Sequence, residues 1–123
     1  MSPDEYQEAA IRSESDSPGL FERMEIVNRE VHACMGIQTE AGELCDVYKK
    51  YLFYNKPIDR TNVIEEMGDL LWYMALLADS VGTSLEECMI RNIAKLRARY
   101  PEKFTEKKAQ ERNLDAERTE LER

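Results

Sequence analysis

The sequence predicts an all-α domain of four to five helices, in which a helical bundle is completed by oligomerisation. Apolar residues recur at helical steps through most of the chain. Glycine and proline, which interrupt helices, are scarce, with five and four in 123 residues. The segment LLWYMALLA, residues 70–78, is apolar around nearly its whole circumference and must be buried on all sides. Four helices in a small monomer give little cover for it, so we expect a homodimer or homotetramer. The alternative is a monomeric bundle with this helix at its centre.

The first half of the chain predicts two helices joined by a polar connection. A short helix is expected over about residues 4–12, and SESDSPGL, residues 13–20, contains a Pro-Gly turn signal. A long helix is expected from Phe21 to Phe53. Gly36 and Gly42 lie inside it, and each costs about 1 kcal/mol of helix propensity. At Gly42 the missing side chain could allow another helix or a ligand to approach closely.

The second half of the chain has clear helix boundaries. Asp59 is a good N-cap for a helix from about residue 60 to residue 80, which ends at Gly82. Capping-box patterns then begin a helix over about residues 84–99, before Pro101. We divide the chain into a folded domain, 1–104, and a highly charged C-terminal arm, 105–123. The arm is expected to be extended or partly helical, and either solvated or laid across a partner subunit.

Composition limits the classes of function. At 123 residues the chain is expected to be one domain. Its 25 acidic against 17 basic residues argue against binding of nucleic acid or of an anionic membrane. Three cysteines without CxxC spacing, and no signal peptide, favour a reducing, cytoplasmic compartment. Residues 70–78 are too few to span a bilayer.

Two acid pairs point to a metal site. Glu40 and Glu43 are three residues apart, and Glu66 and Asp69 repeat that spacing on the next predicted helix. A three-residue step returns to nearly the same helix face, so two adjacent helices would bring four carboxylates together. Such a group cannot stay fully ionised without a compensating cation, and a hard divalent cation such as Mg²⁺ is the natural partner. The structural alternative is burial of these acids against lysine or arginine.

The segments around these acids resemble a known enzyme family. EAGELCDVYKKYLFYNKPIDR, IEEMGDLLWYMALLADSVGTSLEE and NIAKLRARYPEKF are similar to the MazG-like branch of the all-α nucleoside triphosphate pyrophosphohydrolases, from about Gly36 to Phe104. The resemblance implies that the ExxE and ExxD acids bind Mg²⁺, which Mn²⁺ could replace. It also implies hydrolysis at the α-phosphorus, with a nucleoside monophosphate and pyrophosphate as products. One of the four carboxylates could act as general base. The implied role is control or cleansing of a nucleotide pool.

The resemblance also implies residues that touch the substrate. Tyr73, one turn after Asp69, would border the nucleotide, and Asn92 and Lys95 would reach phosphates or sugar. Each has a simpler interpretation, as a core tyrosine or as solvated surface. The remaining candidates are better explained by packing or solvated charge: Lys49, Lys50, Lys56, Trp72 and His32.

Three other functions stay open from the sequence. A non-catalytic oligomeric module with a regulatory or assembly role would keep the fold without turnover. An activity on phosphoribosyl-ATP would use the same fold and cleave the same bond. A di-iron carboxylate bundle normally uses two ExxH motifs, and this chain has one histidine and no ExxH.

Overall fold

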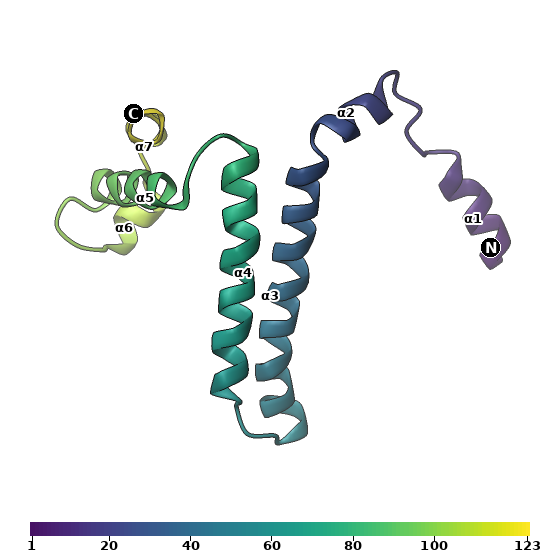
Figure 1. Cartoon of the computed structure of the whole chain (residues 1–123), viewed down its shortest axis with the longest axis horizontal. Helices are drawn as coiled ribbons and strands as arrows, with labels where there is room; N and C mark the ends of the chain where they lie inside the picture. Colours follow the sequence, from purple (N-terminus) through teal and green to yellow (C-terminus); the bar gives the residue numbers. More distant parts are fainter.

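The computed structural model describes residues 1–123 and is built from helices alone (Figure 1). This confirms the all-α prediction, although the chain forms seven helices where four to five were expected. None of them carries an apolar stretch long enough to cross a bilayer. The helices are α1 (Pro3–Ile11), α2 (Leu20–Ile26), α3 (Asn28–Tyr54), α4 (Arg60–Ser80), α5 (Leu85–Arg99), α6 (Glu106–Gln110) and α7 (Leu114–Glu122).

The centre of the molecule is an antiparallel hairpin of α3 and α4, which lie side by side along their length (Figure 1). At its closed end, Asn55 takes the left-handed conformation (φ 52°) that ends α3. Asp59 then caps α4 by accepting a hydrogen bond from the Asn62 backbone N–H at 3.1 Å. At the open end, Arg29 and Asp79 form an exposed ion pair at 2.7 Å.

The long helix expected from Phe21 to Phe53 is wrong in one respect, because the chain leaves helical geometry at Val27. There φ is −102° and ψ is 16°, so α2 and α3 are separate helices that meet at an angle (Figure 1). Ile26 and Val27 are β-branched, and the Asn28 side chain can compete for backbone hydrogen bonds. Their helix propensity is therefore low, although no glycine or proline marks the break.

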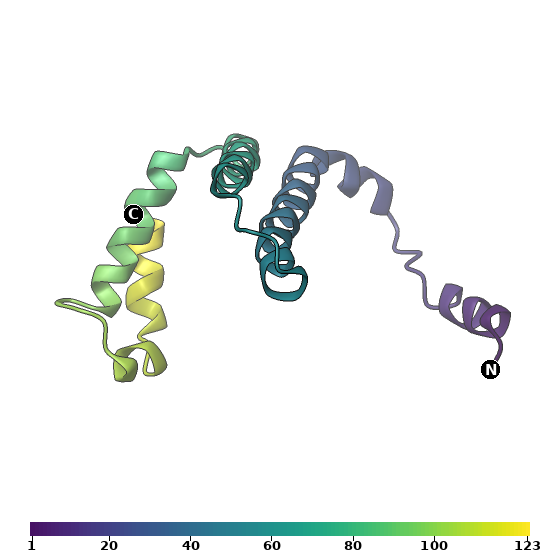
Figure 2. The ribbon, with the colours of Figure 1, turned by 90° about the horizontal axis from the view of Figure 1, so that it is seen from below.

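The C-terminal arm folds back on its own chain instead of lying free in solvent. Helix α7 runs beside α5 (Figure 2). Glu117 of α7 is only 3% exposed and accepts hydrogen bonds from Arg99 at 2.8 and 2.9 Å and from Arg112 at 3.2 and 2.5 Å. Arg91 also donates to the Leu121 carbonyl at 2.9 Å. The arm is therefore anchored to α5, and the domain boundary at residue 104 stays a prediction.

The single chain has a very small core. Its buried apolar side chains are Ala33, Val47 and Ala78. The apolar segment of α4 is not covered as the sequence requires, because Leu71 is 56% and Trp72 59% exposed. Within one chain, α4 is therefore not the centre of a bundle.

Candidate metal centre

The hairpin brings three carboxylates to one point. Glu40 and Glu43 come from α3 and Glu66 from α4, and one oxygen of each lies within 4.8 Å of the others. The two α3 residues share a face because they are three apart, and the antiparallel α4 faces them. We call these three side chains the carboxylate cluster.

The cluster contains acid groups that the chain itself does not satisfy. Glu66 is 5% exposed, and its Oε2 atom is buried without a hydrogen-bond partner. The Oε2 atom of Glu40 is buried and unpartnered in the same way. Burial, together with contact with Glu40 and Glu43, raises the pKa of Glu66 to about 7. Buried carboxylate oxygens are costly unless something compensates them, and a cation among these three groups would do so.

The kind of donor limits the kind of cation. All three groups are carboxylates, and no histidine or cysteine belongs to the cluster. Oxygen-only donors suit Mg²⁺ and Mn²⁺, whereas sites for zinc use nitrogen or sulfur as well. The donor set therefore fits the hard divalent cation expected from the sequence. No lysine or arginine is paired with Glu66, so the alternative of burial against a basic residue does not apply there.

Asn62 supports the cluster and was missed by the sequence analysis. With its amide oriented so that donors meet acceptors, its nitrogen donates to Glu66 Oε1 at 3.1 Å and to Glu65 Oε2 at 3.2 Å. One oxygen of Glu66 is thereby held, and the unpartnered oxygen is left for a cation. The available signal was spacing, since Asn62 lies four residues before Glu66 on the same face of α4.

An open pocket of about 350 Å³ lies beside the cluster and is lined by Glu40, Asp69, Trp72 and Tyr73. We call it the aromatic pocket. Asp69 thus faces the same space as Glu40, but it is not among the three converging carboxylates. The Tyr73 ring packs on Gly36, where an added Cβ would lie 2.2 Å from ring carbons. Only glycine admits the ring at that point of α3, which explains a residue that weakens the helix.

A comparison with protein families identifies the family of the chain. The model of the MazG nucleotide pyrophosphohydrolase domain matches residues 32–104, more than half of the chain. The chain belongs to the MazG family. The matched region contains all three residues of the carboxylate cluster. It also contains Gly36 and Tyr73, which pack on each other.

A curated relative adds little about activity. The chain is 33% identical over 72 residues to "Gene 37 protein" of Mycobacterium phage L5. The alignment covers 55% of this chain and 63% of the phage protein, so the chain spans less than two thirds of that relative. No solved structure matches the chain.

The structure brings some of the predicted MazG site residues together and leaves others apart. Tyr73 lies at the aromatic pocket. The rings of Trp72 and His32 meet its ring edge-on, with centroid-to-centroid distances of 5.0 and 5.8 Å. Asn92 and Lys95 lie on α5, which leaves the open end of the hairpin and packs on α7 (Figures 1 and 2). Within one chain they are not brought to the carboxylate cluster.

Proposed function

We propose that this MazG-family chain hydrolyses a nucleoside triphosphate at the α-phosphorus, giving a nucleoside monophosphate and pyrophosphate. The observation that carries the proposal is the pair of buried, unpartnered oxygens on Glu40 and Glu66, within the region that matches the family. These oxygens support a cation site at the cluster. Phosphoryl chemistry depends above all on positioning and charge neutralisation, which a cation there would supply. The cellular role would be removal of a surplus or modified nucleotide.

Residues of the chain would have separate roles in this reaction. Glu40, Glu43 and Glu66 would hold Mg²⁺, or Mn²⁺ in its place, with Asp69 facing the same pocket. When bound, the cation neutralises phosphate charge and favours deprotonation of water. Water adds to the α-phosphorus, the bond to the bridging oxygen breaks, and pyrophosphate leaves with the electron pair. One of the four carboxylates would accept the proton of the attacking water.

We further propose that a second copy of the chain completes the site. The chain exposes 10408 Å², whereas a compact monomer of 14.3 kDa exposes about 6,800 Å². Apolar side chains on the hairpin and on α5 account for much of this surface, including Leu71, Ile90 and Ile93. A homodimer or homotetramer would bury them, and a second copy could bring its Asn92 and Lys95 to the cluster. Light scattering after gel filtration measures the assembly, and a monomer would contradict this proposal.

The function is tested with a panel of standard and modified nucleoside triphosphates, with phosphoribosyl-ATP included, each with Mg²⁺ and scored for pyrophosphate. Glu43→Gln removes one cluster charge and should abolish release, and Glu86→Gln, on the exposed surface of α5, should leave it unchanged. Release of orthophosphate instead would exclude attack at the α-phosphorus. No release from any compound, with folding and metal binding intact, would favour a non-catalytic module.

A further inference from the structure

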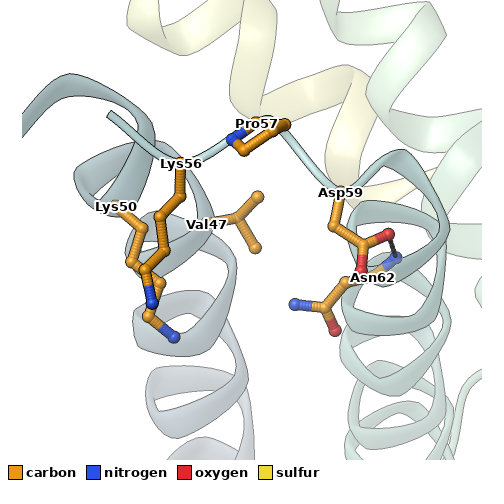
Figure 3. A pocket seen from close by; sticks show the side chains of 6 residues that line it. All are labelled: Val47, Lys50, Lys56, Pro57, Asp59 and Asn62. Carbon is orange, nitrogen blue, oxygen red and sulfur yellow. Dashed lines mark hydrogen bonds between the residues drawn. The ribbon is translucent and has the colours of Figure 1, made fainter. Parts of the chain in front are cut away.

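A second pocket lies at the closed end of the hairpin and has a different chemistry. Its volume is about 250 Å³, and it contains none of the cluster carboxylates. We call it the lysine pocket. Its wall is made by Val47, Lys50, Lys56, Pro57, Asp59 and Asn62 (Figure 3).

The lysine pocket adjoins the carboxylate cluster on both helices. On α3, Glu43, Val47 and Lys50 follow at steps of four and three and share one face. On α4, Asn62 lines the pocket and also donates to Glu66. One helical turn, about 6 Å, separates the positions of Asn62 and Glu66 along α4.

The two lysine side chains lie along α3. Figure 3 shows the side chains of Lys50 and Lys56 running side by side along α3, away from the loop. A helical side chain leans toward the N-terminus of its helix, which on α3 is the direction of the cluster. The Lys50 ammonium accordingly ends beside Asp46, one turn nearer to Glu43 along α3.

The pocket offers an anion two ammonium groups as hydrogen-bond donors. Lys56 forms no ion pair, and Lys50 pairs only with Asp46, at 2.7 Å and half exposed to solvent. Asp59 faces them across the pocket, but one of its oxygens is occupied by the N-cap of α4. An incoming phosphate would gain charge-assisted hydrogen bonds there.

The order of sites along the hairpin gives a direction for a nucleotide. The lysine pocket comes first, the carboxylate cluster follows, and the aromatic pocket with Trp72 and Tyr73 lies beyond it. A volume of about 250 Å³ is below the range of pockets that hold drug-sized ligands, so it suits small anionic groups better than a whole nucleotide. The aromatic pocket offers rings against which a base could pack.

We propose that Lys50 and Lys56 bind the β- and γ-phosphates of the substrate, and hence the pyrophosphate product. The proposal rests on the proposed function for the direction of the nucleotide. Its chemical content is a pyrophosphate subsite separate from the carboxylates. When the α-phosphorus bond breaks, the negative charge of the leaving pyrophosphate is met by the two ammonium groups.

Binding of inorganic pyrophosphate to the full chain, measured by calorimetry with and without Mg²⁺, tests the subsite apart from turnover. Lys50→Met/Lys56→Met should weaken it by about tenfold or more, and Lys56→Met alone by about threefold, since charged hydrogen bonds are lost. Lys56→Met breaks no ion pair, so its fold should be unaffected. The matched control Lys107→Met/Lys108→Met, on α6, removes the same charge and should bind as wild type.

Binding of a nucleoside monophosphate should change less than about twofold in the double variant, because its one phosphate lies at the carboxylates. Equal pyrophosphate affinity in wild type and double variant would overturn the proposal. So would an equal loss for the monophosphate, or the absence of pyrophosphate binding to wild type.

Kinetics separate this proposal from the proposed function. If the chain is active, the double variant should raise the KM of the triphosphate and the inhibition constant of pyrophosphate together. An inactive wild type whose pyrophosphate binding still depends on the lysines would refute the function and keep the subsite. An active enzyme whose pyrophosphate binding does not depend on the lysines would keep the function and refute the subsite.

Discussion

The packing of Tyr73 on Gly36 gives a prediction that can be worked through in numbers. Gly36→Ala adds a Cβ that would lie 2.2 Å from the ring carbons. Non-bonded carbons rest at about 3.5 Å or more, so the ring would have to retreat by about 1.3 Å. Such overpacking costs about 1–3 kcal/mol. The same change returns about 1 kcal/mol of helix propensity.

Gly42 supplies the matched control on the same helix. Nothing lies within 4 Å of an added Cβ there, so Gly42→Ala gains the propensity alone and should stabilise the chain by about 1 kcal/mol. The propensity gain cancels between the two variants. The free energy of unfolding of Gly36→Ala should therefore lie about 1–3 kcal/mol below that of Gly42→Ala.

Urea unfolding followed by circular dichroism, at several protein concentrations, measures this difference. Adding Tyr73→Ala to both variants removes the ring and should close the gap between them. If Gly36→Ala is as stable as Gly42→Ala while Tyr73 is present, the ring does not pack on Gly36. If Gly42→Ala is destabilising instead, another helix packs at that glycine, as a second copy of the chain would.

Three further outcomes follow from the ion pairs and buried acids. In metal-free protein the pKa of Glu66 is raised from 4.5 to about 7, so between these two pH values the folded chain holds a proton that the unfolded chain has released. Stability in EDTA should therefore fall as pH rises from about 4.5 to about 7, and Glu66→Gln should remove that fall. Glu117→Gln should release α7, seen as faster hydrogen exchange over residues 114–122, whereas Glu122→Gln, at an exposed pair on the same helix, should not. Asp79→Asn should lower the free energy of unfolding by less than about 1 kcal/mol, because its pair with Arg29 is exposed.

The hairpin and most of its acids could be predicted because their signals are local. The break at Asn55, the cap at Asp59 and the three-residue spacing of Glu40 and Glu43 each depend on a few neighbouring residues. The convergence of Glu66 then follows from antiparallel packing of two adjacent helices.

Other features depend on partners distant in sequence. Gly36 offered no sign that its contact would be Tyr73, on another helix. Glu117 is one acid among many charges in the arm, and nothing local marks it as the one buried between Arg99 and Arg112. Leu71 and Trp72 stay exposed in the single chain, although the apolar pattern of their segment predicts burial.

Turnover in ¹⁸O-labelled water, with mass spectrometry of the products, tests the proposed chemistry most directly. Attack at the α-phosphorus places one labelled oxygen in the nucleoside monophosphate and none in the pyrophosphate, and Glu43→Gln should give no labelled product. Label in pyrophosphate or in orthophosphate, or turnover that persists in Glu43→Gln, would contradict the role proposed for the carboxylate cluster.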